Sequence, residues 1–324
     1  MVKKFVFFLG LLGLSLSSQA FTASGLGAGA NMAVQLNIAF SADSVGAGLI
    51  AGAPYYCAQG SAVTASTACT NAGYLINTDA LVQYTKDQAS AGNIDNVVNV
   101  ATDHVWIFAG AKDEVVNQSV GRKLYAYYQS LIDNHRINAT FDQQANFAWI
   151  TSSEGNPCWY YGTPYINNCQ LDAAGLMLKS IYGTLQPAVT QNFANLYQFP
   201  QHEFVSNSSA GMDTFGWIYQ PAYCIENACK VHVALHGCNQ NYDTVGAVFI
   251  KNSGLNGWAE ANNIVVIYPQ VLPQSQVNTD GCWDWWGYTG PNYALKSGIQ
   301  MAGIYNLTQS LGTITSFRPG QNLN

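Results

Sequence analysis

The chain has 324 residues and a mass of 35.0 kDa, enough for one large domain or two ordinary ones. Charged residues make up 9% of it, hydrophobic residues 48%, and the net charge is −6. Such an apolar chain is not intrinsically disordered, and the lack of a cationic cluster after Lys3 and Lys4 excludes a nucleic-acid-binding protein. Few charges and many aromatic residues are typical of an exported protein with a neutral, partly apolar ligand.

The first twenty residues have the pattern of a signal peptide. Lys3 and Lys4 precede an apolar run at residues 5–16, and Ser18 and Ala20 are small residues at the positions that a signal peptidase reads. The run is shorter than the about 20 residues that span a bilayer, although it would also fit a buried strand or helix. We expect residues 1–20 to be removed, residues 21–324 to form one extracellular or periplasmic domain, and no stable membrane insertion.

The eight cysteines favour an oxidising compartment. Proximity along the chain suggests four disulfides, although eight cysteines allow about a hundred connectivities. The suggested pairs are Cys57–Cys69, Cys158–Cys169, Cys224–Cys229 and Cys238–Cys282. Because no Cys-x-x-Cys pair occurs, the sequence predicts neither a zinc site nor a redox motif, and we expect no metal and no cofactor.

Strands and helices alternate along the chain. Apolar residues recur every four positions from Met32 to Phe40, which predicts a helix. Further on, the pattern predicts elements in this order: a strand at 105–108, helices at 120–131 and 177–182, and strands at 231–235 and 264–268. Residues 186–220 show no clear periodicity. This alternation predicts an α/β fold in which helices flank a mostly parallel sheet.

A glycine-rich turn at residues 25–29 precedes the first predicted helix, where an α/β-hydrolase has its Gly-x-Ser-x-Gly nucleophile elbow. Other sequence blocks follow in order at residues 50–57, 106–113, 156–158, 164–169, 235–240 and 281–288. With these blocks the chain resembles the secreted poly(3-hydroxybutyrate) depolymerase family of the single-domain, fungal type. The resemblance covers nearly all of residues 21–324 and implies a circularly permuted α/β-hydrolase fold.

The resemblance also implies roles for individual residues. Asp113 matches the acid of a Ser-His-Asp triad, and the backbone N–H groups of Ala28 and Cys238 match the oxyanion hole. The aromatic wall of a substrate-binding crevice corresponds to Trp283, Trp285 and Trp286. The alternatives are an aspartate that stabilises a turn, and tryptophans that pack in the core.

Two departures from the family pattern affect the predicted chemistry. The elbow has Gly27 where the family has the nucleophilic serine, and Phe147 stands where the family has the histidine. Possible substitutes are Ser24, which precedes the elbow, and Ser208 and Ser209, which lack the first glycine of an elbow. On a strand, His232 and His236 would lie about 13 Å apart, too far for one metal ion.

A third departure concerns the strand that precedes the elbow in the family. Removal of residues 1–20 leaves only residues 21–24 before the glycine-rich turn. We therefore expect either that this central strand is lost or that part of the predicted signal peptide forms it. Loss of the strand would expose sheet edges.

The sequence thus predicts a secreted, monomeric, depolymerase-like protein of the carboxylic ester hydrolase class with impaired catalysis. It would retain binding of a polyester or another hydrophobic ester ligand. Two alternatives remain open. One is an active extracellular depolymerase or esterase with relocated catalytic groups, and the other is a non-catalytic surface or interaction protein.

Overall fold

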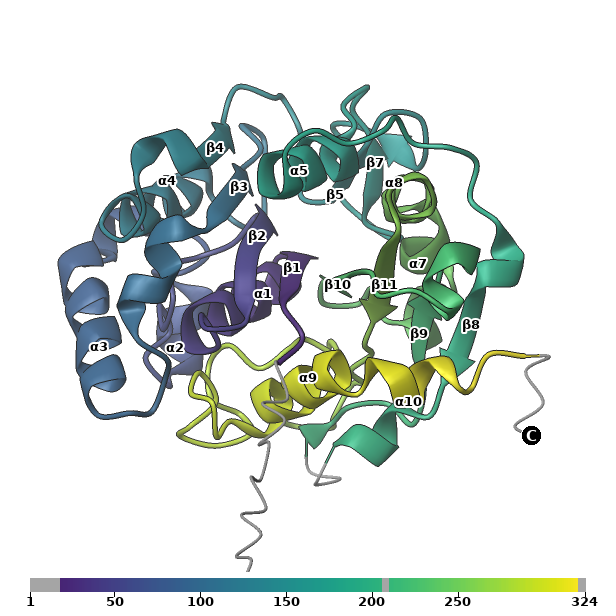
Figure 1. Cartoon of the computed structure of the whole chain (residues 1–324). Coiled ribbons are helices and arrows are strands. Elements are labelled where there is room, and N and C mark those ends of the chain that lie inside the picture. The colour runs from purple at the N-terminus through teal and green to yellow at the C-terminus, as the bar shows by residue number, and fades with distance from the viewer. Residues whose placement is uncertain (1–17, 206–209, 320–324) are drawn as a thin grey trace, which may run out of the picture.

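An eight-stranded sheet forms the centre of the computed structural model, which describes residues 18–205 and 210–319 (Figure 1). Its strand order is β4-β3-β2-β1-β10-β11-β9-β8. The strands are β1 (Phe21–Leu26), β2 (Ser44–Ile50), β3 (His104–Phe108), β4 (Ile137–Thr140), β8 (Leu196–Phe199), β9 (Gly216–Tyr219), β10 (Lys230–Leu235) and β11 (Ile264–Tyr268). From β4 to β11 all neighbours are parallel, whereas β9 pairs antiparallel with both β11 and β8.

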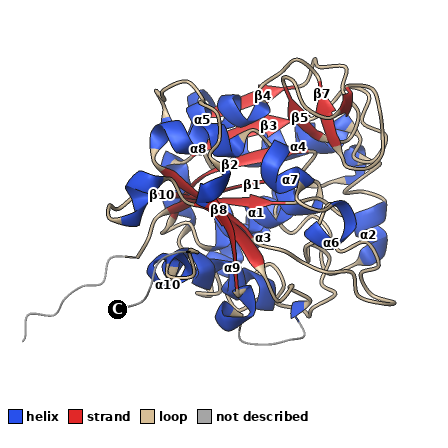
Figure 2. Cartoon of the chain, turned by 90° about the vertical axis from the view of Figure 1, so that its right-hand side faces the viewer, coloured by secondary structure: helices blue, strands red, loops and turns tan. Residues whose placement is uncertain are grey.

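Helices cover both faces of this sheet (Figure 2). The α-helices are α1 (Ala28–Ala39), α2 (Ala62–Ser66), α3 (Thr78–Ser90), α4 (Gln118–Gln129), α5 (Ala173–Tyr182), α6 (Tyr242–Val245), α7 (Val248–Asn252), α8 (Leu255–Asn262), α9 (Ile299–Gln309) and α10 (Leu311–Thr315). The 3₁₀ helices are η1 (Gly73–Leu75), η2 (Val97–Thr102), η3 (Asn134–Arg136), η4 (Phe193–Asn195), η5 (Gln201–Phe204) and η7 (Ala222–Ile225). On one face α1 packs against β1, β2 and β10 and α9 packs against α1, while α5 and α8 cover the other face. The predicted α/β fold with a mostly parallel sheet is confirmed.

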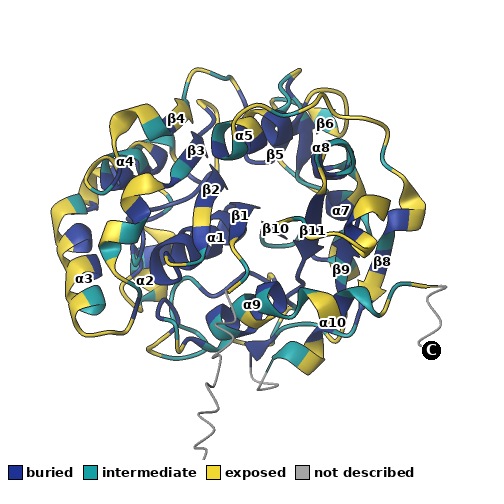
Figure 3. Ribbon diagram, viewed as in Figure 1, coloured by how far each residue is buried: buried dark blue, intermediate teal, exposed yellow. Residues whose placement is uncertain are grey.

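The core lies on both faces of the central strands, against α1 on one face and against α5 and α8 on the other (Figure 3). Strands β10 and β11 are nearly continuous apolar runs because helices bury both of their faces. Every residue of α1 is buried, since this helix lies between the sheet and α9. The carboxyl ends of the parallel strands β1 and β10 are therefore held by a rigid layer, and the loops that follow them start from fixed positions.

The expectation that the strand before the elbow is lost, or comes from the predicted signal peptide, is wrong. β1 begins at Phe21 and lies at the centre of the sheet, between β2 and β10. In the sequence, the polar residues Thr22 and Ser24 make this segment look unlike a buried strand. In the structure, each of them shares a hydrogen bond of 2.7 Å with a nitrogen of the His232 ring on β10. Residues 1–17 lie outside the described residues, so the predicted signal peptide remains a prediction.

A second, three-stranded sheet has the order β5-β7-β6 and stands beside the main one. Its strands are β5 (Trp149–Thr151), β6 (Asn156–Pro157) and β7 (Ile166–Asn168). The Cys158–Cys169 disulfide joins the ends of β6 and β7. The loop between these two strands is thus closed at its base.

All four suggested disulfides are present in the structure. They are Cys57–Cys69, Cys158–Cys169, Cys224–Cys229 and Cys238–Cys282. The last one closes the longest loop, with a sequence separation of 44, and ties the segment after β10 to the tryptophan-rich segment. Within residues 18–205 and 210–319, no helix has the length and apolar character needed to cross a bilayer.

Candidate active site

The turn from β1 into α1 has the geometry of a nucleophile elbow. Gly27 has φ +56° and ψ −113°, a conformation that residues with side chains rarely adopt. Its N–H donates to the Ile50 carbonyl at 2.9 Å, which holds the turn against the end of β2. The helix leaves the strand so tightly that a Cβ on Gly25 would lie 2.2 Å from the carbonyl carbon of Gly29. The sharp turn is present, but its apex carries no side chain.

The ring of Phe147 lies directly over that apex. A Cβ built on Gly27 would be 2.8 Å from Phe147 Cζ. The ring is 6% exposed and meets Tyr165 edge-on, with the ring centroids 6.2 Å apart. The space beside the elbow is thus occupied by apolar carbon.

Asp113 lies in the loop that follows β3, next to the loop that carries Phe147. The two loops are joined by hydrogen bonds, among them one of 3.0 Å from the Glu114 N–H to Asn146 Oδ1. The Asp113 carboxylate accepts bonds from the N–H groups of Val115 and Val116 at 2.9 and 2.7 Å. Burial raises the pKa of Asp113 to about 7, against the opposing effect of these two backbone hydrogen bonds. This carboxylate therefore stabilises its own turn.

A cavity of about 200 Å³ opens beside Gly27. It is lined by Gly27, Ala28, Asn31, Cys69, Thr70, Val115, Val116, Phe147, Tyr161, Tyr165, Cys238, Asn239, Asp280 and Trp285. Ala28 is the first residue of α1, so its N–H has no acceptor within the helix. Over the described residues, nothing accepts a hydrogen bond from the Cys238 N–H either. Two backbone donors from separate segments thus border one mixed polar and apolar cavity.

The three predicted tryptophans have different surroundings. Trp285 lines the cavity, and the ring of Trp286 packs edge-on against the ring of Trp285, with the ring centroids 5.8 Å apart. Trp283 is fully buried, packs against His236 and does not line the cavity, which matches the alternative of a tryptophan packed in the core. Neighbouring residues of an irregular segment point in different directions, and only the structure reveals which one faces the cavity.

Sequence reasoning missed several lining residues. Tyr161 and Tyr165 come from the loop between β6 and β7, and burial together with Tyr165 raises the pKa of Tyr161. Asn239 and Asp280 are held together by a 2.6 Å hydrogen bond from the Asn239 N–H to the Asp280 carbonyl. Asn239 and Asp280 each lie within two residues of a cysteine of the Cys238–Cys282 disulfide, and this proximity is the sequence feature that could have identified them.

Among the serines considered above, Ser24 is described by the structure, and it does not line the cavity. Ser24 does share its 2.7 Å hydrogen bond with His232, but both residues are fully buried in the sheet. Burial lowers the pKa of His232 to about 3 and that of His236 to about 4, so both rings are neutral near pH 7. Ser208 and Ser209 lie outside the described residues. No group of three or more His, Cys, Asp or Glu suited to a metal ion occurs within the described ranges.

Two curated proteins are similar to this chain in sequence. A poly(3-hydroxybutyrate) depolymerase from Delftia acidovorans is 43% identical over 297 residues, which are 90% of this chain and 59% of that protein. A polyhydroxybutyrate depolymerase from Talaromyces funiculosus is 34% identical over 319 residues, which cover 90% of this chain and 88% of that protein. The chain thus spans less than two thirds of the Delftia acidovorans relative but most of the fungal one. No family model matches the chain.

Two solved structures are also similar. The crystal structure of PHB depolymerase from Penicillium funiculosum aligns with a TM-score of 0.83 at 32% identity, covering 91% of this chain and 96% of that one. A serine-to-alanine variant of PHB depolymerase complexed with R3HB trimer gives the same TM-score and identity, covering 92% and 99%.

Proposed function

This chain belongs to the polyhydroxybutyrate depolymerase family, and we propose that it binds a short stretch of a 3-hydroxyalkanoate polyester without hydrolysing it. The observation that carries the proposal is the contact between Gly27 and Phe147 at the elbow. An apolar ring fills the space that a nucleophile and its base would need. The backbone donors and the aromatic wall around that space remain.

Loss of hydrolysis follows from the chemistry of these two residues. Ester cleavage by this class requires a hydroxyl nucleophile and a base that accepts its proton. Gly27 has no side chain, and the ring of Phe147 has no atom that accepts a proton. In a serine hydrolase the loss of one such residue lowers turnover about a millionfold. Asp113 alone cannot restore the reaction, because its role is to orient a histidine that is absent.

Among the described residues, the alternative of relocated catalytic groups has a structural candidate in the hydrogen-bonded pair Ser24 and His232. Both residues are fully buried and lie on the adjacent central strands β1 and β10. A substrate could reach them only if the sheet opened. The pair therefore supports the sheet, and we assign it no catalytic role.

Retained binding is supported by the form of the cavity. The N–H groups of Ala28 and Cys238 can donate to an ester carbonyl, since both border the cavity without another acceptor. Trp285, Tyr161 and Tyr165 can pack against the methyl and methylene groups of the ligand. The serine-to-alanine variant of the related PHB depolymerase is complexed with R3HB trimer. The four disulfides support secretion to an oxidising compartment as a single domain of residues 21–324, which we expect to be monomeric.

Titration calorimetry with R3HB trimer, followed by mass spectrometry of the same sample, tests this proposal. We expect saturable binding and no shorter products. Trp285→Ala should weaken binding about tenfold, because it removes one aromatic wall, while the control Tyr223→Ala changes an exposed residue of η7 and should bind like the unmodified protein. Absence of binding would favour the interaction-protein alternative, and release of monomers or dimers would favour relocated catalytic groups.

A further inference from the structure

Two tyrosines are stacked between the loop that follows β2 and helix α3. The rings of Tyr56 and Tyr84 are parallel, with an interplanar angle of 4° and the ring centroids 3.7 Å apart. Aromatic pairs in proteins are usually offset or edge-on, with the centroids about 4.5–7 Å apart, so this face-to-face pair is unusually close. Tyr293 also stacks on Tyr56, but at 5.8 Å and 22°. Tyr84 is therefore the nearer of the two phenol rings that Tyr56 contacts.

The backbone holds both rings of this stack in place. Tyr56 has φ +57°, a left-handed conformation that is strained for a bulky residue and persists only where the surroundings enforce it. Its carbonyl accepts a hydrogen bond of 3.0 Å from the Gln59 N–H, and the next residue, Cys57, is bonded to Cys69. Tyr84 belongs to the regular helix α3. Both rings thus project from fixed positions, and strain at one of them marks a place with a function besides packing.

The phenol groups of the pair lie close together and are accessible. Burial raises the pKa of Tyr84, and the neighbouring Tyr56 hydroxyl raises it further, because the two oxygens are side by side. Both side chains are half-buried, so a small oxidant reaches them in the folded protein. Since the rings are parallel, the ring carbons beside the two oxygens, Cε1 and Cε2, also face each other.

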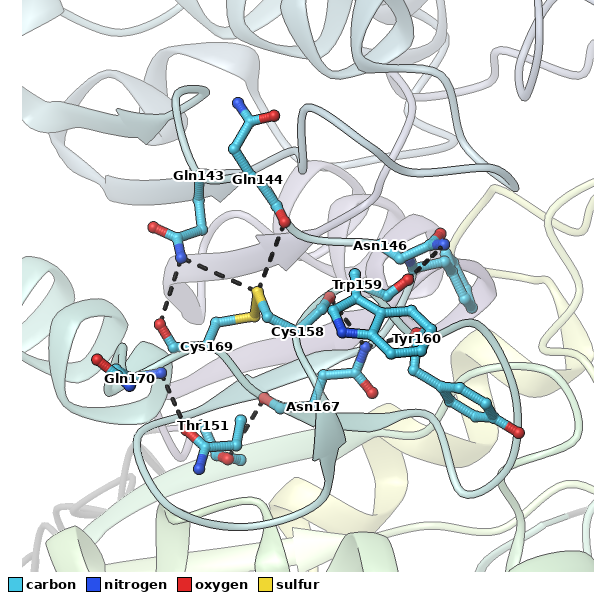
Figure 4. The surroundings of a disulfide bond; sticks show 12 residues. Gln143, Gln144, Asn146, Thr151, Cys158, Trp159, Tyr160, Asn167, Cys169 and Gln170 are labelled. Carbon is cyan, nitrogen blue, oxygen red and sulfur yellow. Dashed lines mark hydrogen bonds between the residues drawn. A yellow bond between two sulfur atoms is a disulfide. The ribbon is translucent and has the colours of Figure 1, made fainter.

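Other tyrosines do not have this geometry. Across residues 18–205 and 210–319, the tyrosine pairs that exclude Tyr56 are tilted or edge-on; the rings of Tyr161 and Tyr165, for example, meet at 53°. Tyr160 also lies near a disulfide, but its ring meets that of Trp159 at 71°, with the centroids 6.2 Å apart (Figure 4). Proximity to a disulfide therefore does not by itself produce a stacked pair.

We propose that Tyr56 and Tyr84 form a dityrosine cross-linking site that hydrogen peroxide and a haem peroxidase close. Each phenol gives one hydrogen atom to the oxidant and becomes a phenoxyl radical. The two radicals join through one carbon–carbon bond between the carbons beside the oxygens. The hydrogens on these two carbons then move to the oxygens, which restores both phenols. In total the protein loses two hydrogen atoms, which reduce one hydrogen peroxide to two molecules of water.

This bond would connect the loop after β2 to α3 and close a loop that contains the Cys57–Cys69 disulfide. Cys69 and Thr70 line the cavity, so the cross-link would fasten one wall of it. The four disulfides favour an oxidising compartment, in which such an oxidant persists. The proposal does not depend on the proposed function, since it involves no polyester.

The test is oxidation of the full chain at low concentration, followed by isolation of the monomer and peptide mapping. Cleavage before Asp79 separates the two tyrosines, so after reduction of the disulfides only a dityrosine joins their peptides. We expect that linked product, lighter by two hydrogen atoms, together with dityrosine fluorescence. The cross-link should raise the melting temperature of the unmodified protein by about 2–4 °C, because it restricts the unfolded chain.

Matched variants assign the bond to this pair. Tyr56→Phe and Tyr84→Phe keep the stacked ring but lack one phenol, so each should abolish the fluorescence and the rise in melting temperature. The control Tyr160→Phe changes a tyrosine that is 39% exposed beside another disulfide and should retain both.

Three results would overturn the cross-linking site. One is fluorescence that survives in Tyr84→Phe, or that Tyr160→Phe lowers equally. Another is a linked product that joins Tyr56 to Tyr293 in place of Tyr84. The third is the absence of the linked product from unmodified protein in which Tyr74, which is 80% exposed, has been oxidised. Binding of R3HB trimer by the untreated protein is a separate measurement, so either proposal can fail without the other.

Discussion

The ring of Phe147 occupies the space into which any side chain on Gly27 would project, since a Cβ at that position would be 2.8 Å from Phe147 Cζ. Carbon atoms in contact are about 3.5–4.0 Å apart, so a phenylalanine in this pose requires a glycine at the elbow. Gly27 and Phe147 are therefore physically coupled. A change at one of these residues should alter the effect of a change at the other.

We expect Gly27→Ala to destabilise the protein by about 2–4 kcal/mol in urea unfolding, because it adds overpacking against Phe147 to the strain of a positive φ. Gly246→Ala is a matched control, since Gly246 has φ +64° and nothing lies within 4 Å of a Cβ built there. Gly246→Ala should therefore be destabilised only by the strain of its positive φ, without any overpacking. In a Phe147→Ala background, Gly27→Ala should lose the overpacking cost, and equal costs in both backgrounds would contradict the coupling.

Repair of both positions should restore ester hydrolysis. Gly27→Ser alone has no base and clashes with Phe147, and Phe147→His alone has no nucleophile. Because triad residues act as a unit, we expect each single variant to stay near background and Gly27→Ser/Phe147→His to rise well above their sum on a short-chain chromogenic ester.

A third substitution tests the role of Asp113 in the repaired protein. Its carboxylate has a pKa raised to about 7 by burial, and a neighbouring imidazolium would favour the ionised form. Adding Asp113→Asn to the double variant should therefore remove most of the restored activity. A folded double variant that remains inert would show that residues 27 and 147 are not the two catalytic positions.

Much of the fold could be predicted from the sequence because its central strands are buried on both faces. The short apolar segments of β10 and β11 are typical of strands that are buried on both faces. β1 was not recognisable, since Thr22 and Ser24 look polar until their bonds to His232 are known. The short antiparallel strands β8 and β9 were also missed, because four-residue strands have too few residues to show a period.

The residues of the site also divide into those that the sequence could place and those that it could not. Residues 27, 28, 147 and 238 line one cavity. Residues 27, 28 and 238 belong to recognisable sequence blocks, and Phe147 lies shortly before the block at 156–158. Tyr161 and Tyr165 could not be placed, since their loop is held by side-chain hydrogen bonds from Asn146 and Asn167 that the sequence does not reveal. The sequence also could not distinguish Trp283 in the core from Trp285 at the cavity.

The buried His232 should make the protein sensitive to acid. Burial lowers its pKa from 6.5 to about 3, so below pH 6.5 the unfolded chain binds a proton that the folded chain does not. Its contribution to stability is therefore complete above pH 6.5 and falls as the pH drops towards 3, by about 1.4 kcal/mol per pH unit. Asp103 acts in the opposite sense, because burial raises its pKa from 3.8 to about 7 and its contribution is lost as the pH rises through that value.

Comparison of His232→Asn with the unmodified protein isolates the contribution of this histidine to the pH dependence of stability. His232→Asn should lower stability at neutral pH but make the free energy of unfolding less steeply dependent on pH between 6 and 4, by about 1.4 kcal/mol per unit. Asn134→Ala, at an exposed residue without a titratable group, serves as the control and should leave the pH dependence unchanged. An identical pH dependence for His232→Asn and the unmodified protein would refute the assignment.

We expect the Cys238–Cys282 disulfide to stabilise the protein more than the Cys224–Cys229 disulfide does. Its sequence separation is 44, against 5 for Cys224–Cys229. Restriction of the unfolded chain predicts losses of about 4 and about 2 kcal/mol when each pair is replaced by alanines. Urea unfolding of the two variants measures both values, and a larger loss for the Cys224–Cys229 pair would contradict this ranking. Replacement of the Cys238–Cys282 pair should also weaken binding of R3HB trimer, because Asn239 and Asp280 lie beside this disulfide and line the cavity.

The measurement that tests the central claim most directly is turnover of R3HB trimer by the unmodified protein at saturating ligand. Mass spectrometry over several hours should detect bound, intact trimer and no products above a protein-free control, while Gly27→Ser/Phe147→His releases them. Hydrolysis by the unmodified protein at ordinary enzymatic rates, about 1–10³ s⁻¹, would contradict the account, because the contact between Gly27 and Phe147 would then not determine the chemistry of this site.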